Sequence, residues 1–200
     1  MTQISPALII HWFRARKLWL VLFLLALAVQ FFQLEPFFRL DRELIAQWQL
    51  WRLLTAHISH LNWPHFLLNM AGLLMVMVFF SAYRSQAYWL GALLFIAMLV
   101  SAGLLLDGRL DRYVGLSGVL HGLFIMGAWW EMKQHRYSGL MLLVLITAKL
   151  IWEQAFGALP GSEQMTGGRV AVNAHLYGAL AGVAYLGLTR TFHKNALFDT

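Results

Sequence analysis

Apolar stretches long enough to cross a lipid bilayer recur along almost the whole chain. A membrane-spanning helix needs about 20 mostly apolar residues, because the hydrocarbon core of a bilayer is about 30 Å thick. Of the 200 residues, 60% are hydrophobic and 12% are charged, whereas soluble domains are roughly 45–50% apolar and about 25% charged. A soluble core of this size could not bury so much apolar surface. The sequence therefore predicts an all-α, polytopic membrane protein, because helices satisfy their own backbone groups in lipid.

Six stretches of the sequence have this character, and we predict one membrane-spanning helix for each. Their approximate bounds are residues 17–34, 63–82, 86–106, 115–131, 138–156 and 170–190. The predicted fold is a six-helix bundle in a single membrane domain, residues 17–190, flanked by cytoplasmic segments 1–16 and 191–200. No small-residue cleavage site follows the basic cluster near the N-terminus, so we expect the first stretch to stay in the protein.

The distribution of basic residues favours termini on the cytoplasmic side. Six spans place both termini on one side of the membrane. With the termini inside, the inner segments hold slightly more Lys and Arg than the outer loops. We therefore interpret the net charge of +6 as a signal for membrane orientation, and we predict no nucleic-acid partner. The chain has no cysteine, which excludes disulfides, thiolate metal ligands and a cysteine nucleophile.

Polar residues inside the predicted spans are candidates for function, because polar groups in lipid are costly. His65 and Asn69 are four residues apart and therefore share one face of the second span. Asn62 can cap this helix, and Pro64 suits its first turn. The alternative interpretation is that His65 and Asn69 make interhelical hydrogen bonds for packing.

A second polar cluster is the sequence GLSGVLHG, residues 115–122. Ser117 lies where a predicted loop becomes a helix, and its neighbours Gly115 and Gly118 leave room for another helix or a substrate backbone. His121 lies one turn further along the same face. A single serine in such a helix usually bonds its own backbone, so this motif alone is a weak signal.

A third polar cluster lies in the last predicted span. His175 shares a helix face with Gly178 and Gly182. This stripe of small residues would let the helix pack tightly against a neighbour, which would bring His175 close to that neighbour. The alternative is a purely structural histidine.

Together, the three clusters supply the parts of a serine hydrolase. A serine hydroxyl becomes a good nucleophile when a base takes its proton, and His175 can be that base for Ser117. A tetrahedral intermediate needs hydrogen-bond donors aimed at its oxyanion, and His65, Asn69 and the backbone N–H of Ser117 are suitable donors. The sequence places no acidic residue to orient His175. We therefore predict a Ser–His dyad that uses no cofactor and no metal ion.

The combination resembles the rhomboid family of intramembrane serine proteases over nearly the whole chain. The matching residues are Trp51, Arg52, His60, His65, Asn69, Gly115, Leu116, Ser117, Gly118, Ala174, His175, Gly178 and Gly182. Their order and their placement in the spans match as well, which makes the combination more specific than any one motif. The resemblance implies a six-helix bundle with Ser117 as nucleophile, His175 as base and an active site open to the outer face.

One position departs from the common rhomboid pattern. Rhomboids commonly carry a tyrosine four residues after the serine, where it stacks against the catalytic histidine, and here that position is His121. This form of the motif in a compact chain resembles the rhombosortase branch, in which we expect His121 to support His175. The resemblance implies a transmembrane substrate, namely an exported bacterial protein whose C-terminal tail has a Gly-Gly motif, one span and a basic end. The enzyme would then lie in the bacterial inner membrane with its active site facing the periplasm.

Other functions stay open as alternatives. Metal or haem binding is the first, with imidazole ligands from His57, His60, His65, His121 and His175. Against it, the chain lacks an HExxH motif, and no carboxylate accompanies the histidines in the sequence. A transporter, in which the polar clusters line a path, is the second alternative. Against it, the six spans show no repeated halves. Lys149 and Glu153, an i, i+4 pair in the fifth span, are expected to neutralise one another or to snorkel, with a role in a substrate gate as the alternative.

Overall fold

The computed structural model describes residues 16–195, with side chains described as far as residue 190. Within that range, six long helices each overlap one predicted stretch: α2 (Lys17–Phe31), α6 (Trp63–Phe79), α7 (Gln86–Asp107), α8 (Ser117–Gln134), α9 (Arg136–Phe156) and α11 (Val172–Asn195). The short elements are α3 (Glu35–Phe38), β1 (Leu40–Asp41), α4 (Arg42–Ala46), α5 (Arg52–Thr55), η1 (Ala56–Ile58), η2 (Ser81–Tyr83), β2 (Arg112–Tyr113) and α10 (Ser162–Thr166). The predicted cytoplasmic segment 1–16 lies outside the described residues except for Arg16, and so does the second half of the predicted tail 191–200.

Among the described residues, two helices are by themselves long and apolar enough to cross a membrane, namely α7 and α9. A third candidate is the segment Arg52–Ile58 taken together with α6, two helical pieces that are bent by 92°. Helix α2 is apolar but has only 15 residues. Helices α8 and α11 carry glycines, histidines and charged residues, which lower their hydropathy. The chain is therefore a multi-pass membrane protein, and the number of six spans stays a prediction.

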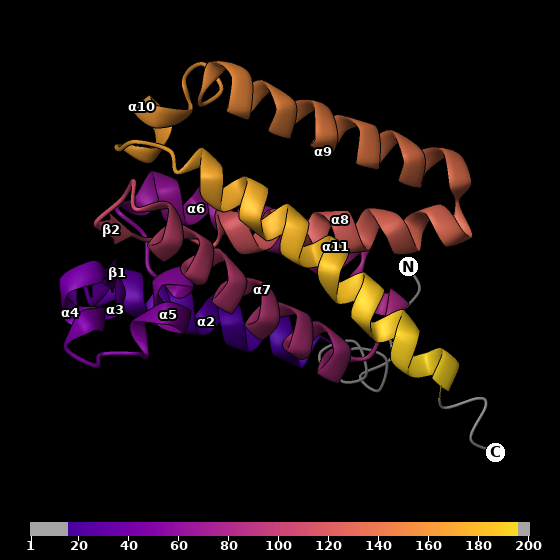
Figure 1. Ribbon diagram of the computed structural model, residues 1–200, viewed down its shortest axis with the longest axis horizontal. Helices are drawn as coiled ribbons and strands as arrows, with labels where there is room; N and C mark the ends of the chain where they lie inside the picture. Colours follow the sequence, from indigo (N-terminus) through magenta and orange to yellow (C-terminus); the bar gives the residue numbers. More distant parts are fainter. Residues whose placement is uncertain (1–15, 196–200) are drawn as a thin grey trace, which may run out of the picture.

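Helix α8 lies inside the bundle, where it contacts α6, α7, α9 and α11 (Figure 1). Its side chains Val119, Leu123 and Met126 are fully buried. Helix α9 lies at the edge of the bundle, and only its residues Gly139, Leu150 and Glu153 are buried. Most of α9 is therefore exposed on the outside of the bundle, and Glu153 is an inward-facing carboxylate on this helix.

Helices α8 and α11 cross in very close contact, because glycines line both sides of the crossing. A Cβ atom on Gly178 would overlap the carbonyl group of Gly118. A Cβ atom on Gly182 would lie 2.5 Å from the carbonyl oxygen of Gly122, and one on Gly118 would lie 2.9 Å from the carbonyl oxygen of Ala174. Small residues of this kind let two helix backbones approach one another within a membrane. The first turn of α8 is thereby held beside the start of α11.

One end of the bundle is closed by short elements, among them α3, β1, α4, β2 and α10, which lie toward the left in Figure 1. Strands β1 and β2 pair antiparallel, with Asp41 opposite Arg112, and the Asp41 carboxylate accepts a hydrogen bond from Arg112 Nε at 3.0 Å. Burial raises the pKa of Asp41, but the Leu44 backbone N–H and the Arg112 guanidinium together hold that pKa below its usual value. Buried Arg52 donates to the carbonyl oxygen of Arg39 at 2.9 Å. These contacts tie the segment before α6 to the segment that leads into α8.

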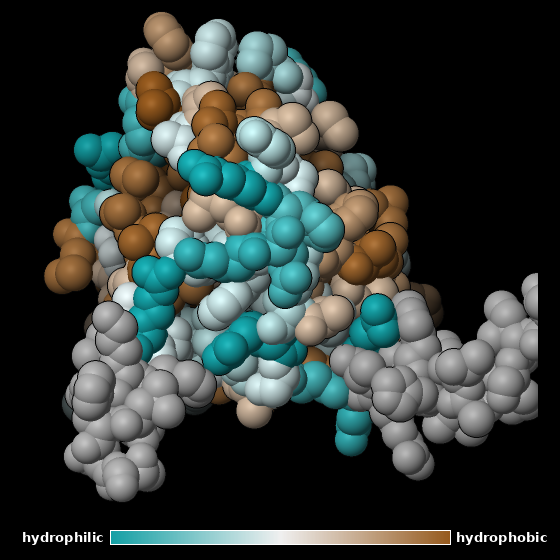
Figure 2. All heavy atoms as spheres, turned by 90° about the vertical axis from the view of Figure 1, so that its right-hand side faces the viewer, coloured by the Kyte–Doolittle hydropathy of each residue, from teal (hydrophilic) through white to brown (hydrophobic). Residues whose placement is uncertain are grey.

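The opposite end of the bundle carries basic side chains stacked on aromatic rings. Arg84 lies 4.7 Å from the ring centre of Tyr88 and 4.8 Å from that of Trp130. Arg190 lies 4.1 Å from the ring centre of Trp129. Figure 2 looks onto this end and shows hydrophilic side chains gathered between apolar flanks. Aromatic residues are enriched at both interfaces of a membrane protein, and Lys and Arg are in excess in its cytoplasmic loops, so the orientation of the chain stays a prediction.

Candidate active site

Ser117 is the first residue of α8, and the backbone just before it has a shape that requires glycine. Gly115 has a φ of +127°, and a Cβ atom there would lie 2.9 Å from Nε2 of His65. Its N–H donates to the carbonyl oxygen of Ala56 at 3.0 Å, and its carbonyl oxygen accepts from the Tyr113 hydroxyl at 2.8 Å. These bonds hold the turn before the helix, so Ser117 stands at a helix N-terminus beside His65.

His175 lies on α11 with its imidazole directed at Ser117. Its Nε2 is 3.0 Å from the Ser117 hydroxyl oxygen, and the residue is 6% exposed. The glycine-lined crossing of α8 and α11 makes this distance possible, because Gly118 lies next to Ser117 and packs against Ala174, the neighbour of His175. The serine and the histidine that the sequence singled out therefore meet in hydrogen-bond contact.

An acidic residue also contacts His175, so the sequence-based statement that no acidic residue is placed to orient His175 was wrong. Glu153 Oε2 lies 2.9 Å from Nδ1 of His175, and Glu153 is 3% exposed. Glu153 comes from α9 and precedes His175 by 22 residues. Its i, i+4 spacing to Lys149 is itself a sufficient explanation for a charged pair in a helix, so the sequence pattern gives no reason to connect it with His175. Its buried position on a largely exposed helix is visible only after the helices are packed.

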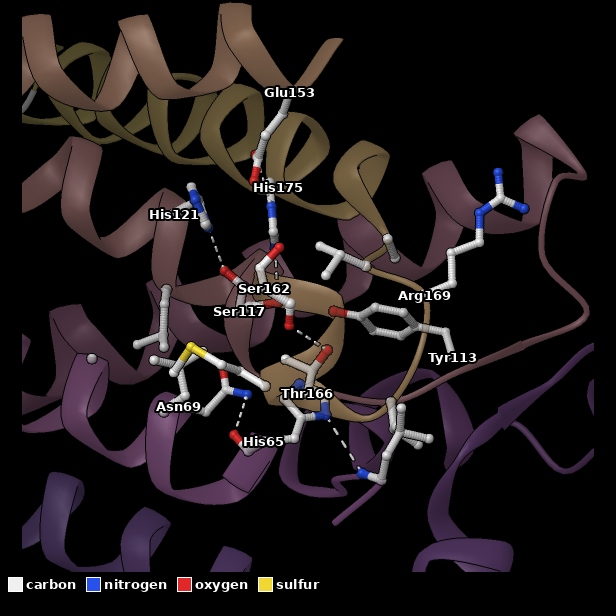
Figure 3. A pocket seen from close by; sticks show the side chains of 18 of the residues that line it. His65, Asn69, Tyr113, Ser117, His121, Glu153, Ser162, Thr166, Arg169 and His175 are labelled. Carbon is white, nitrogen blue, oxygen red and sulfur yellow. Dashed lines mark hydrogen bonds and ion pairs between the residues drawn. The ribbon is translucent and has the colours of Figure 1, made fainter. Parts of the chain in front are cut away.

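Lys149 and His121 make further contacts with Glu153 and Ser117, and Figure 3 shows His121 beside His175 and Ser117. The Lys149 ammonium donates to Glu153 Oε1 at 2.6 Å and to His121 Nε2 at 2.9 Å. Nδ1 of His121 lies 2.7 Å from the carbonyl oxygen of Ser117. The rings of His121 and His175 stack with their centres 4.1 Å apart and their planes 17° apart. Five residues from three helices thus form a closed ring of contacts, in which Ser117 takes part with both its hydroxyl and its backbone carbonyl group. We call these residues the Ser117 network: Ser117, His121, Lys149, Glu153 and His175.

Part of this network has the composition of a metal site. One ligand atom each from His121, Glu153 and His175 lie within 4.8 Å of one another, so the sequence-based argument that no carboxylate accompanies the histidines was wrong. The Lys149 ammonium, however, lies between two of these groups, in contact with both Glu153 and His121. These two atoms are therefore engaged by a cation of the protein, and a metal ion would have to displace Lys149 to bind them. The arrangement therefore fits a hydrogen-bonded network and does not fit a metal centre.

His65 and Asn69 lie on α6, across from Ser117. The Asn62 side chain caps this helix by accepting from the His65 N–H at 2.9 Å. The nearest contact of His65 Nδ1 is the N–H of Leu61 at 3.5 Å, which leaves Nε2 to carry the proton next to Gly115. Asn69 donates to the His65 carbonyl oxygen at 3.0 Å. Both side chains line the same cavity as Ser117, so they are placed to donate to a group held there.

His60 packs behind His65. Its ring is almost perpendicular to that of His65, with the ring centres 5.2 Å apart. Burial lowers the pKa of His60 to about 3. A neutral, buried ring in this position supports the orientation of His65 by contact. His60 does not line the cavity that contains Ser117.

The cavity at the Ser117 network has a volume of about 670 Å³. Apolar side chains such as Leu68, Phe124 and Met165 supply part of its wall, and Arg112 and Arg169 also line it. Helix α10 covers it, and the Asn62 side chain donates to the carbonyl oxygen of Thr166 at 2.7 Å to hold α10 against α6. The predicted site residues that line it are His65, Asn69, Ser117, His121 and His175.

A second serine–histidine pair lies elsewhere in the bundle. His57 Nε2 is 3.0 Å from the hydroxyl oxygen of Ser101 and 3.0 Å from the carbonyl oxygen of Ala97. The Ser101 hydroxyl donates to the carbonyl oxygen of Leu53 at 2.6 Å. Both residues are buried, and neither lines the cavity. This pair therefore fastens the segment before α6 to α7 and has no access to a substrate.

Comparison with known proteins places these residues in a family context. The family model of the Rhomboid domain matches residues 47–192 of the chain. The matched range contains the whole Ser117 network together with His65 and Asn69. No curated protein matches the chain.

Proposed function

The chain belongs to the rhomboid family of intramembrane serine proteases, and we propose that it cleaves a transmembrane substrate with Ser117 as nucleophile and His175 as general base. The observation that carries this proposal is the contact of 3.0 Å between the Ser117 hydroxyl oxygen and Nε2 of His175. The contact lies in a cavity that is large enough for a stretch of peptide backbone.

The proposed reaction follows the serine hydrolase scheme. The Ser117 oxygen bonds to the substrate carbonyl carbon while its proton moves to Nε2 of His175. The imidazolium then gives this proton to the leaving amine nitrogen as the peptide bond breaks, which leaves an acyl-enzyme on Ser117. Water attacks that ester, with His175 again taking and returning a proton. The Ser117 backbone N–H, His65 Nε2–H and the Asn69 amide are the proposed donors to the oxyanion.

A fluorophosphonate probe tests the catalytic residues without knowledge of the natural substrate. The purified protein is expected to form a covalent adduct at Ser117, and Ser117→Ala and His175→Ala should each abolish labelling in a folded protein. The two losses should not add in the double variant, because the residues act as a unit. Labelling of Ser117→Ala at the normal rate, or activity lost only on chelation, would contradict the proposal and favour a metal enzyme.

For the substrate, we propose the C-terminal tail of an exported protein, cut at or near a Gly-Gly pair on the periplasmic side of the bacterial inner membrane. A peptide bond in a stable helix is shielded by the hydrogen bonds of that helix. Each glycine weakens a helix by about 1 kcal/mol relative to alanine, so two adjacent glycines favour local unwinding. A following span and a basic cytoplasmic end would hold the tail in the matching orientation.

Co-expression with a reporter tests this substrate. A reporter with such a tail should acquire a new C-terminus at or near the Gly-Gly pair, which mass spectrometry of the reporter identifies. Changing both glycines to leucine should slow processing strongly, and Ser117→Ala should stop it. Equal processing of the leucine reporter would exclude this substrate class, while the adduct at Ser117 would still support the protease assignment.

A further inference from the structure

The hydrogen-bonding directions in the Ser117 network are determined by its two charged members. A carboxylate only accepts hydrogen bonds, and an ammonium group only donates them. Glu153 therefore accepts a hydrogen bond from Nδ1–H of His175. This leaves Nε2 of that ring free to accept a hydrogen bond from the Ser117 hydroxyl. Lys149 donates to Nε2 of His121, so the opposite ring nitrogen of His121 carries the proton and donates to the Ser117 carbonyl oxygen.

Only one tautomer of His175 can act as a base toward Ser117. The proton of the ring must lie on Nδ1, because Nε2 must hold a lone pair to receive the serine proton. In water the two neutral tautomers of imidazole interconvert freely, and a fixed partner of Nδ1 selects one of them. Glu153 is that partner at 2.9 Å, and its position on α9 is held by the bond of 2.6 Å to Lys149.

We propose that Glu153 is a positioning residue that holds His175 in the tautomer that can act as a base, and that Lys149 orients the Glu153 carboxylate. Lys149 binds Oε1 of Glu153, which leaves Oε2 to accept from His175. This inference rests on the proposed function of Ser117 and His175. It makes the site a Ser–His–Glu arrangement whose third member comes from the largely exposed helix α9. The Glu153 carboxylate stays ionised throughout and faces the imidazolium that forms during proton transfer.

The substitution Glu153→Gln exploits the presence of Lys149. The new amide oxygen should turn to the Lys149 ammonium, because the amide NH2 group cannot accept from it. The NH2 group then faces Nδ1 of His175 and donates to it, which moves the ring proton to Nε2. That tautomer cannot take the Ser117 proton. A change of this kind lowers turnover by up to about 10⁴-fold in a serine protease triad.

The assay is the rate of fluorophosphonate labelling at Ser117 as a function of probe concentration. We expect Glu153→Gln to lower the limiting rate constant by about 10²–10⁴-fold, while the half-saturating probe concentration stays within about threefold. The double variant Glu153→Gln with Lys149→Met frees the amide to turn its oxygen to His175. Its limiting rate constant should be at least about tenfold higher than that of Glu153→Gln, which corresponds to about 1.4 kcal/mol of activation free energy. The rates are compared at equal amounts of folded protein, because Lys149→Met also removes the ammonium group that Glu153→Gln leaves without its carboxylate partner.

Two further variants keep the test decisive. Glu131→Gln is the matched control, since Glu131 is an acid of α8 that is bonded to Ser138 at 2.6 Å and to Tyr83, and it does not line the cavity. It should label at the wild-type rate. Glu153→Asp keeps the charge beside Lys149 but withdraws the carboxylate from His175, so it should fold and label at least about tenfold more slowly.

The outcomes separate the two proposals. A folded Glu153→Gln protein with a limiting rate within threefold of wild type, or a double variant no faster than Glu153→Gln, overturns the positioning role. If Glu153→Gln does not fold, a Glu153→Asp protein that labels at the wild-type rate overturns it equally. In each of these cases, loss of labelling in Ser117→Ala leaves the proposed protease function standing. Equal labelling of wild type and Ser117→Ala would instead remove the proposed function itself.

Discussion

At the scale of single residues, His121 has three contacts, and two of them distinguish it from a phenylalanine in the same position. Its ring stacks on His175, and its two nitrogens bond to Lys149 and to the Ser117 carbonyl oxygen. A phenyl ring could keep the stack but neither hydrogen bond. The stack restrains the His175 ring from one face, while Glu153 restrains it along its edge, and Lys149 connects the two restraints by its bonds to His121 and Glu153.

We predict that His121→Phe keeps appreciable activity, with a loss of labelling rate of no more than about tenfold, because a stacked ring remains beside His175. His121→Ala removes the stack as well and should lose more. The measurement is fluorophosphonate labelling of both variants at equal amounts of folded protein. A stable but fully inactive His121→Phe protein would show that the hydrogen bonds of His121, rather than its ring, are what the site requires.

His65 and Asn69 are predicted to stabilise the oxyanion, which develops only as the Ser117 oxygen attacks. Removing one such donor typically costs about 10²–10³ in rate. We therefore expect His65→Ala and Asn69→Ala each to lower turnover by roughly this factor while Ser117 still labels slowly. Asn173→Ala is a matched control, because Asn173 donates to Asp107 at 2.9 Å and does not line the cavity. Normal cleavage rates in both variants would place the oxyanion donors elsewhere.

At the scale of elements, the distance between Ser117 and His175 depends on the glycine crossing of α8 and α11. We predict that Gly178→Ala lowers the thermal midpoint and the labelling rate together, because its Cβ atom must push α11 away from α8. Overpacking of this kind costs about 1–3 kcal/mol. Both quantities can be measured on the detergent-purified protein by thermal denaturation and probe labelling.

The same helix supplies the control for this prediction. A Cβ atom at Gly187 would meet no atom within 4 Å, and alanine is a better helix former than glycine by about 1 kcal/mol. Gly187→Ala should therefore fold at least as stably as wild type and label normally. If Gly178→Ala behaved in the same way, the close crossing would not be what holds the two residues together.

The contrast between the elements and the site shows what the sequence can predict. Each long helix overlaps a predicted stretch, because apolar length is a local property that a single segment reveals. His65, Asn69 and Ser117 were singled out because polar residues in apolar helices stand out, and they line one cavity. Glu153 was assigned to a local pair with Lys149, because its contact to His175 arises only when α9 packs against α8 and α11.

At the scale of the whole molecule, the two ends of the bundle differ in chemistry. The end with β1, β2 and α10 holds the cavity, and the other end holds the basic side chains stacked on aromatic rings. Lys and Arg are in excess in cytoplasmic loops, so the proposed orientation puts this basic end in the cytoplasm. A cavity at the opposite end would then open toward the periplasm, where the carbonyl of an exported substrate can reach Ser117.

The natural absence of cysteine makes this orientation directly measurable. We predict that a single cysteine at Gln164→Cys, on exposed α10, reacts with a membrane-impermeant maleimide in intact spheroplasts. Gln134→Cys, an equally exposed glutamine at the end of α8, should react only after the membrane is disrupted. Each variant is the control of the other, because both replace the same residue type at an exposed position. The opposite pattern would put the cavity in the cytoplasm. It would rule out cleavage on the periplasmic side while leaving the contact between Ser117, His175 and Glu153 unchanged.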